Sequence, residues 1–476
     1  MRKRRLFLAN IGRRRVNSPS ATPPVGILSL AAYVRERLDV EIRLVDQRAE
    51  NWPTERLVRE ALAFEPDIVG FTALTSFAGM LREAACGVRQ ACPEAWIVVG
   101  GPHASALGVQ AFESLDADAL VMGEGEIAFE RIIEARIEGE DLSEIPGLIW
   151  RNAAGETVLN AGTAPIIEDL DHLPFLAYDL LNRDRYATIP RMSQLPPGPY
   201  LSLFTSRGCP YQCAYCHNIF GKRFRMQSAE RVVAEIDHLV RAYGVHEFEF
   251  FDDVFNLDGR RVLDFSRLVT ERDLKLRIDF PNAVRTDLLT EEQIDALVAA
   301  GMYRSSFALE SGSPRIQKLI RKNLDIDKFL NGVRMAVDRG VFAHGFTMLG
   351  FPTETEEELR MTLDVACESR LHTATFFTVI PYPNTELYRM VEATAPEKLT
   401  RVVYEDTDYT GIQVNLADVS DATLYAYQRK AWRQFYMKPG RVYRILRDYP
   451  SLRHLPSYVP LYLLRLAKGF WSPAKT

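Results

Sequence analysis

The sequence predicts an α/β protein in three parts: a doubly wound parallel sheet, a partial barrel of six βα units and a mostly helical C-terminal extension. Its 476 residues exceed one ordinary domain of about 150 residues. Hydrophobic residues make up 47% and charged residues 25%, as in folded chains with a large core. Short apolar segments alternate with helical patterns, which is typical of parallel sheets covered on both faces. The predicted boundaries are 1–140, 141–198 (a connector), 199–385 and 386–476.

The first part alternates strands and helices from its beginning. Apolar runs predict strands at residues 5–10, 40–46, 67–71, 96–100 and 119–122. Helical spacing predicts helices at residues 23–38, 54–64, 77–91 and 127–136. In such a fold, ligands bind beyond the carboxyl ends of the strands.

Small residues are concentrated at these strand ends. Glycine lets the backbone approach a ligand closely, and Ser and Thr hydroxyls add hydrogen bonds. One such loop would be an ordinary turn, but four at one sheet edge indicate a ligand site. The absence of G-x-G-x-x-G at the first helix disfavours a nicotinamide cofactor. The candidates are Thr22, Pro23, Gly26, Thr72, Thr75, Ser76, Gly100, Gly101, His103, Gly123, Glu124 and Gly125.

A connector separates the two α/β parts. Segments 145–150 and 156–160 predict a small hairpin, and a proline-containing stretch follows. The alternation then resumes, with helices predicted at 228–243, 291–300 and 354–368 among others. Barrel chemistry belongs at the carboxyl ends of the strands. The six strands are predicted at 200–205, 247–251, 277–280, 305–309, 343–349 and 373–380.

Three of the six cysteines, Cys209, Cys213 and Cys216, follow the first barrel strand as C-x3-C-x2-C. Clustered thiols with this spacing indicate metal or redox chemistry. A structural zinc needs four closed ligands, and the adjacent His217 is the available fourth. Three thiolates on a [4Fe–4S] cluster would instead leave one iron open for a cosubstrate. A third interpretation is that the three cysteines are unrelated.

Segment 206–216 (SRGCPYQCAYC) resembles the cluster loop of radical S-adenosylmethionine (SAM) enzymes. Further strand ends agree in order: FEFFDDVF, LESG and GFTMLGFPTE. The N-terminal TPPVG, VVGGPHA and MGEGE are similar to the cobalamin-binding half of the class B, cobalamin-dependent members. The resemblance covers about residues 1–390. It implies a Rossmann-like B12-binding domain followed by a TIM-like radical SAM barrel.

The resemblance also implies a [4Fe–4S] cluster on the three cysteines, with SAM beside it. From the sequence alone, Asp252 and Asp253 could instead cap the next helix. Arg285 could be a surface charge, and the basic run 222–225 a solvated turn or a contact to an anionic ligand. The residues placed near SAM are Tyr215, Asp252, Asp253, Arg285, Glu310 and Gly350.

Cobalamin is the third cofactor that the resemblance implies, bound by the N-terminal loops. Many cobalamin proteins use D-x-H-x-x-G to supply a histidine to cobalt. None of the eight histidines here lies in that pattern. The resemblance therefore implies base-off cobalamin without that ligand.

These cofactors functionalise unactivated carbon, which no side chain can do. The expected function is C-methylation of a small-molecule substrate, natural-product or lipid-like, with electrons from a donor such as flavodoxin or ferredoxin. A non-methylating reaction such as cyclisation, oxidation or rearrangement is the first alternative, because the cysteine motif is shared. A corrinoid or iron–sulfur sensor or carrier without turnover is the second.

Charge and hydropathy bear on partners and location. A net charge of −5 gives no support for nucleic-acid binding. No run of 18 uncharged apolar residues predicts a membrane span, and the N-terminal apolar run is too short for a signal peptide, so a cytoplasmic protein is expected. Residues 424–436 predict an aromatic-rich helix. The apolar–basic segment 458–470 could contact a membrane surface or pack on the barrel.

Overall fold

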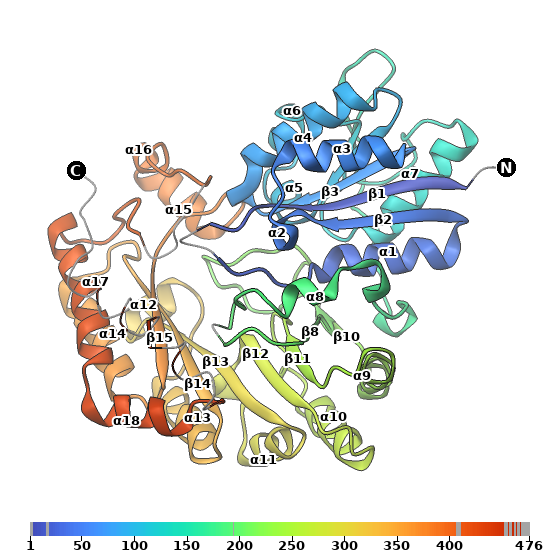
Figure 1. The fold of residues 1–476 in the computed structure, drawn as a ribbon. Helices are drawn as coiled ribbons and strands as arrows, with labels where there is room; N and C mark the ends of the chain where they lie inside the picture. Colours follow the sequence, from blue (N-terminus) through green and yellow to red (C-terminus); the bar gives the residue numbers. More distant parts are fainter. Residues whose placement is uncertain are drawn as a thin grey trace. The chain divides into compact units, whose positions relative to one another are not determined.

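The computed structural model describes residues 3–15, 19–193, 195–405 and 411–451, and the helical positions 456, 459, 460, 463 and 467. Most of the predicted membrane-contact segment 458–470 therefore lies outside the described residues. The chain forms two compact units, which are described separately below (Figure 1). Unit 1 comprises Met1–Pro199, His217–Gln227 and Tyr404–Thr407; unit 2 comprises Tyr200–Cys216, Ser228–Val403 and Asp408–Thr476.

Unit 1 is built on a seven-stranded sheet with the order β2-β1-β3-β4-β5-β6-β7. The first five strands are parallel, as predicted. The predicted hairpin forms as β6 and β7, and β6 pairs antiparallel with β5, so the hairpin extends this sheet. The strands are β1 (Arg4–Ile11), β2 (Val40–Asp46), β3 (Ile68–Ala73), β4 (Trp96–Gly100), β5 (Ala119–Leu120), β6 (Ile149–Arg151) and β7 (Thr157–Leu159).

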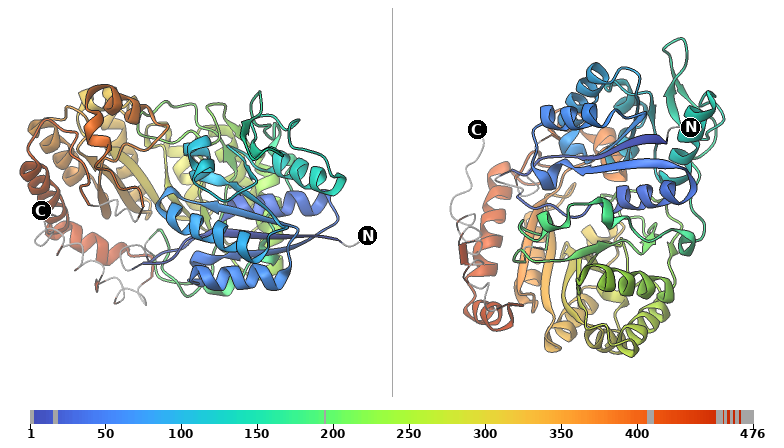
Figure 2. Two further views of the ribbon diagram at one scale, coloured as in Figure 1. Left: turned by 90° about the horizontal axis from the view of Figure 1, so that it is seen from above. Right: turned by 45° about the vertical axis from the view of Figure 1, so that its right-hand side comes forward.

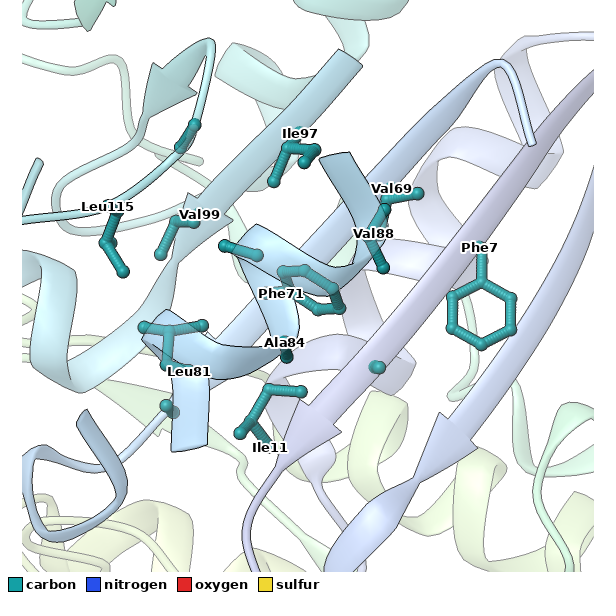
Figure 3. Close-up of a cluster of buried hydrophobic side chains, with 14 of the residues drawn as sticks. Phe7, Ile11, Val69, Phe71, Leu81, Ala84, Val88, Ile97, Val99 and Leu115 are labelled. Carbon is teal, nitrogen blue, oxygen red and sulfur yellow. The ribbon is translucent and has the colours of Figure 1, made fainter. Parts of the chain in front are cut away.

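Helices cover both faces of this sheet. Alternate residues of a strand point to opposite faces, so Phe7 and Ile11 of β1 pack with Leu81 and Val88 of α4 in the apolar core shown in Figure 3. The opposite face packs against α7, whose Phe129 lies against Gly70. The helices are α1 (Val25–Arg37), α2 (Gln47–Glu50), α3 (Thr54–Phe64), α4 (Ala78–Ala91), α5 (Gly101–Leu107), α6 (Val109–Glu113), α7 (Glu126–Glu138) and α8 (Arg183–Tyr186), with 3₁₀ turns η1 (Thr75–Phe77), η2 (Leu170–His172) and η3 (Tyr178–Leu180).

Unit 2 contains a six-stranded, fully parallel sheet with the order β15-β14-β13-β12-β11-β8. Its strands follow one another in chain order, as expected for successive βα units of a partial barrel. The sheet strands are β8 (Leu201–Leu203), β11 (Glu247–Phe250), β12 (Arg277–Val284), β13 (Met302–Glu310), β14 (Phe342–Leu349) and β15 (Thr373–Thr378). Short strands β9 (Ser206–Arg207) and β10 (Arg225–Met226) lie on either side of residues 208–224.

Helices follow the strands of unit 2 as predicted. Several begin at a side chain that accepts a backbone N–H hydrogen bond, as at Ser228, Thr290 and Thr355. They are α9 (Ala229–Tyr243), α10 (Gly259–Glu271), η4 (Thr286–Leu288), α11 (Glu291–Ala299), α12 (Pro314–Leu319), α13 (Ile326–Asp338), α14 (Glu356–Glu368), α15 (Glu386–Thr394), α16 (Pro396–Leu399), α17 (Asp421–Tyr436) and α18 (Pro439–Asp448).

The C-terminal helices close the β15 edge of unit 2. Helix α17 stays beside α14 and β15 in both views of Figure 2. The hydroxyl of Tyr436 accepts a hydrogen bond from the N–H of Ala374 (2.9 Å) and donates one to its C=O (2.7 Å). These two hydrogen bonds satisfy the backbone N–H and C=O of Ala374 on the edge strand β15, which would otherwise have no partner strand on that side. Within the described residues, no helix is long and apolar enough to cross a bilayer.

Candidate active site

The cysteine loop is fixed at its centre by Ala214. The N–H of Ala214 donates to the C=O of Ile320 (2.8 Å), and its C=O accepts from the N–H of Leu387 (2.7 Å). Ala214 is buried, whereas Cys216 is exposed and Cys213 is half-buried. Two neighbouring segments of unit 2 therefore hold the loop while its cysteines stay accessible.

Arg285 holds a second point of this loop. Its guanidinium carbon lies 3.6 Å from the ring centroid of Tyr211, close enough for a cation–π interaction. Asp287 orients the guanidinium through two hydrogen bonds of 2.9 and 3.0 Å. The side chain is only 11% exposed, so the surface-charge interpretation of Arg285 is wrong. Arg285 positions the loop from the end of β12.

Asp252 contacts the start of the same loop. Its carboxylate accepts hydrogen bonds from the backbone N–H (3.1 and 3.2 Å) and the hydroxyl (2.8 Å) of Thr205. Burial raises the pKa of Asp252. The interpretation of Asp252 and Asp253 as helix caps is wrong, because α10 is capped by Asp258. Asp253, the next residue, is half-buried.

Glu310 presents a carboxylate beside the cluster loop. Its Oε1 accepts hydrogen bonds from the Nζ of Lys322 (3.1 Å) and the hydroxyl of Tyr215 (3.2 Å). No described residue donates to its Oε2. Glu310 also has a φ of +62°, at a register shift between β13 and β14. A backbone strained in this way is typical of functional sites, and the open oxygen fits a ligand.

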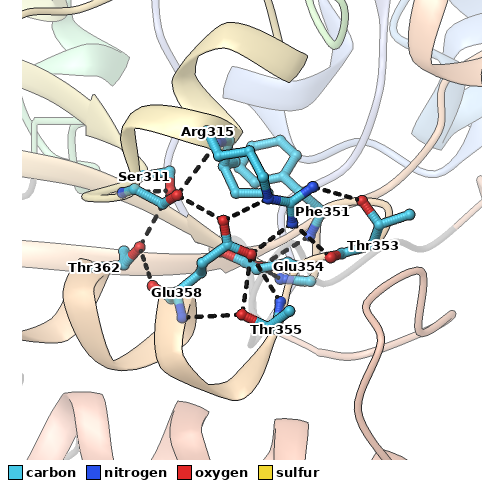
Figure 4. Close-up of polar contacts among 11 residues, drawn as sticks. Ser311, Arg315, Phe351, Thr353, Glu354, Thr355, Glu358 and Thr362 are labelled. Carbon is cyan, nitrogen blue, oxygen red and sulfur yellow. Dashed lines mark hydrogen bonds and ion pairs between the residues drawn. The ribbon is translucent and has the colours of Figure 1, made fainter.

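The ends of β13 and β14 are joined by one polar network (Figure 4). Arg315 donates from Nε to Glu358 Oε1 (2.8 Å) and from Nη2 to the C=O of Thr353 (2.7 Å). The hydrogen bond from Arg315 lowers the pKa of Glu358 to about 2. Gly312 packs so closely on α14 that a Cβ would lie 2.6 Å from the C=O of Met361. Glycine at this position therefore lets the β13 loop seat against α14.

Glu354 organises the loop after β14. Its Oε2 accepts hydrogen bonds from the N–H of Gly350 (2.7 Å) and of Phe351 (3.1 Å). Its Oε1 is buried without a partner among the described residues. Burial raises the pKa of Glu354 to about 8. The ring of Phe351 lies 6.0 Å from that of Tyr215, which connects this loop with the cluster loop.

Replacing Glu354 with Gln is expected to remove a pH dependence of stability. The pKa of Glu354 is about 8 in the folded chain and about 4.5 in the unfolded chain, so the folded chain holds the proton more tightly. The resulting contribution to the free energy of unfolding is complete below about pH 4.5 and is lost as the pH rises to about 8. The thermal midpoint of the Glu354→Gln variant, measured relative to that of wild type, should therefore rise across this range. Exposed Glu357→Gln on α14 is the control. Parallel profiles for Glu354→Gln and wild type would contradict the assignment.

The small-residue loops of unit 1 meet at one sheet edge, as expected. The Gly101 backbone has φ +82°, and a Cβ there would lie 2.0 Å from Thr72 Oγ1. His103 Nδ1 lies 3.4 Å from Thr75 Oγ1, and the N–H of Gly123 donates to Ser105 (2.9 Å). The loops after β3, β4 and β5 are therefore mutually supported.

Open backbone remains at this edge for a ligand. Apart from its chain neighbours and the backbone of its own helix, no described residue lies within 4 Å of a Cβ built on Gly26, and the nearest atom to one on Gly100 is 3.7 Å away. Burial lowers the pKa of His103, which favours the neutral imidazole. These backbone surfaces fit a large, flat, mostly neutral ligand such as a corrin.

Glu124 is engaged by a buried partner in unit 1. The Nη2 of Arg225 forms an ion pair with Glu124, and Nη1 also donates to it (3.2 Å). The two side chains are 4% and 2% exposed. The expectation that residues 222–225 form a solvated turn is therefore wrong for Arg225, although Arg223 is exposed and pairs with Glu168 (2.6 Å). The carboxylate of Glu124 shapes its loop through these bonds.

The three cysteines supply the donor set of the predicted cluster. None is in a disulfide, and thiolate sulfur suits iron–sulfur ligation. Among the described residues, no three His, Cys, Asp or Glu side chains are gathered as a metal site, so the structure does not discriminate between the zinc and the iron–sulfur alternatives. The residues fit a cluster bound by a single anchored loop.

Two family models match the chain. The radical SAM superfamily matches residues 203–366, and the B12 binding domain matches residues 14–133. An uncharacterized methyltransferase of Pyrococcus horikoshii is 32% identical over 422 residues, covering 88% of both chains. This chain belongs to the radical SAM family with a B12-binding domain. Membership brings a [4Fe–4S] cluster, SAM and cobalamin as cofactors.

More distant relatives agree. The cytidylyl-2-hydroxyethylphosphonate methyltransferase of Streptomyces wedmorensis is 27% identical, with 78% of each chain covered. The radical SAM methyltransferase TsrM of Kitasatospora setae, solved with cobalamin and a [4Fe–4S] cluster, gives a TM-score of 0.68 at 20% identity, covering 82% of this chain and 75% of TsrM. A second TsrM structure holds a tryptophan substrate and a SAM analogue. At these identities the structures show the shared fold.

Several site residues were not predicted from the sequence. Lys322, Arg315 and Tyr211 act only through contacts with segments distant in the chain. Glu358 had a signal, because Thr355 and Glu358 form a capping box at the start of α14. Nothing in the basic run 222–225 distinguished the buried Arg225 from the exposed Arg223.

Proposed function

We propose that this protein is a cobalamin-dependent radical SAM enzyme that methylates a carbon atom of a small-molecule substrate. The observation that carries the proposal is that both cofactor-binding folds occur in one chain, which is 32% identical to a methyltransferase over 88% of its length. In this proposal, residues 1–140 bind cobalamin, 141–198 connect, 199–385 bind the cluster and SAM, and 386–476 form the helical extension.

Cobalamin binding is assigned to the loops of unit 1. Thr72 lies so close to Gly101 that only glycine fits there, and Gly26 and Gly100 present open backbone to the ligand. Cobalamin binds base-off in this proposal, because no histidine occurs in D-x-H-x-x-G. When bound, the three cofactors supply the one-electron and methyl-transfer chemistry that side chains lack.

Cluster and SAM binding are assigned to unit 2. Cys209, Cys213 and Cys216 hold the cluster. Arg285 and Asp252 keep the loop in position, and Glu310 Oε2 accepts hydrogen bonds from SAM. Holding reactants in a fixed orientation contributes a large part of such rate enhancements.

The substrate and partners belong to the same proposal. Tryptophan for TsrM and a cytidylyl phosphonate for the Streptomyces enzyme support a small-molecule substrate. A flavodoxin or ferredoxin supplies electrons. Exposed apolar side chains at Val459 and Leu463 support a peripheral membrane contact, which flotation with anionic liposomes tests.

The reaction class is tested with anaerobically reconstituted protein, SAM, cobalamin and a reductant. 5′-Deoxyadenosine together with S-adenosylhomocysteine supports methylation. 5′-Deoxyadenosine alone supports the non-methylating alternative, and neither product supports the sensor or carrier.

Replacing Glu310 with Gln is expected to weaken SAM binding about tenfold, since a hydrogen bond to a charged group contributes about 1.5–3 kcal/mol. Equilibrium dialysis with labelled SAM measures the affinity of the reconstituted protein. Glu392→Gln on α15, an exposed carboxylate of unit 2, is the control. Unchanged SAM affinity in Glu310→Gln would refute the assigned role.

A further inference from the structure

A pocket of 660 Å³ in unit 1 is lined by residues that the proposed function does not use. Three consecutive arginines, Arg13, Arg14 and Arg15, line it directly after β1. Asn51, which follows α2, and Thr54, the first residue of α3, contribute to the lining as well. The three arginines lie in the same β1–α1 connection as Thr22 and Pro23, but no lining residue of this pocket is itself among those assigned to cobalamin.

The arginine loop is held in place by its backbone and by packing. The N–H of Arg14 donates to Asn51 Oδ1 (3.1 Å). A Cβ on Gly12 would lie 3.2 Å from the Phe77 ring, so the loop packs directly on that ring. The guanidinium of Arg15 lies 5.5 Å from the centroid of Phe77. These contacts position Arg14 and Arg15 directly after β1, at the ligand-binding edge of the sheet.

Two of these arginines, Arg13 and Arg14, lack the carboxylate partner that several other arginines of unit 1 have. Arg43 pairs with Glu60, and Arg89 pairs with Asp118. Neither Arg13 nor Arg14 forms an ion pair or a side-chain hydrogen bond with any described residue, and Arg14 Nε is buried. Arg14 is half-buried and Arg13 is exposed. A guanidinium that lines a cavity and has no ion pair is suited to bind an anion from solution.

The chemistry of the lining favours a phosphoryl group. The planar guanidinium matches phosphoryl oxygens with paired N–H donors. Helix α3 begins at Thr54, which lines the pocket, and has no side-chain cap. The first backbone N–H groups of this helix therefore remain available to an anion. Glu55 and Glu83 also line the pocket, and three arginines against two carboxylates leave one positive charge.

We propose that this pocket binds the phosphoryl group of an organic anion through Arg13 and Arg14. Two sources share this chemistry: the phosphodiester of cobalamin, and a phosphorylated ligand bound separately. The proposal does not depend on methylation, because its test measures binding to the full chain without cluster or SAM.

The test is calorimetric titration of inorganic pyrophosphate at constant ionic strength. Wild type should bind saturably, and Arg13→Gln/Arg14→Gln should bind at least tenfold more weakly. Arg59→Gln/Arg131→Gln is the charge-matched control, because both arginines are exposed in unit 1 and have no ion pair among the described residues. It should bind within about twofold of wild type. Thermal midpoints must show that both variants are folded.

Titration with cobalamin and with cobinamide, which lacks the phosphodiester, distinguishes the two sources of the phosphoryl group. A loss of affinity for cobalamin alone in Arg13→Gln/Arg14→Gln assigns the pocket to the phosphodiester. Unchanged affinity for both corrinoids assigns it to a separate phosphorylated ligand. No saturable pyrophosphate binding by wild type, or equal binding by Arg13→Gln/Arg14→Gln and the charge-matched control, would overturn the proposal.

Discussion

Alanine at Cys209, Cys213 and Cys216 together is expected to remove the cluster and to reduce SAM cleavage to the level of a protein-free control. These cysteines alone have ligand spacing, and Ala214 and Tyr211 hold their loop in unit 2. Iron and sulfide content, and 5′-deoxyadenosine formation after reduction, measure the two losses. Because Ala214 makes its hydrogen bonds through the backbone, the loop should keep its path in the variant.

The other three cysteines provide the matched control. Alanine at Cys86, Cys92 and Cys367 should leave iron content and SAM cleavage near wild type, since these thiols are dispersed in the sequence. Four irons retained in the first triple variant would refute the cluster assignment. So would cluster loss in the control while that protein remains folded.

Replacing Arg225 with Met is expected to destabilise unit 1 by about 3–5 kcal/mol, because Glu124 would keep a buried, unpaired charge. Arg225 also donates a hydrogen bond to the C=O of Ile167, and the variant loses that bond. Urea unfolding of unit 1 measures the change. Arg225→Met/Glu124→Leu should recover much of the loss, since an apolar pair removes the stranded charge.

Arg223→Met separates this effect from general loss of a cation. Arg223 lies two residues away and pairs with Glu168, but the arginine side chain is 69% exposed. An exposed pair contributes about 0–1 kcal/mol, so this variant should unfold near wild type. Equal destabilisation in Arg223→Met and Arg225→Met would contradict the buried-pair assignment.

Local patterns predicted most elements of both sheets. Apolar strands such as β2 and β4, and helix α3, form at the predicted residues. The spacing of apolar residues within each of these segments is enough to predict it. Differences occur at ends: β12 continues to Val284, and β5 comprises only Ala119–Leu120. Backbone hydrogen bonding between strands sets these ends, and a single strand does not contain that information.

The cofactors were predicted because their signals are short and local. C-x3-C-x2-C fits in eight residues, and glycine-rich loops directly follow their strands. The supporting contacts are long-range by comparison: Tyr211 meets Arg285, and Glu310 meets Lys322 after a turn and a helix. Such contacts are chosen by the packing of whole elements.

By itself, the sequence determined the α/β class, the succession of the elements, the cysteine loop and the pairing of B12 and SAM chemistry in one chain. Only the tertiary structure decided which charged residues are buried. Arg225 and Arg223 are equivalent in sequence, yet one is buried against Glu124 and the other is exposed. Asp252 could be a helix cap until β8 and β11 pair and bring it to Thr205. The physical reason is desolvation: whether a charge needs a partner depends on the segments that exclude water from it, and these are distant in the chain.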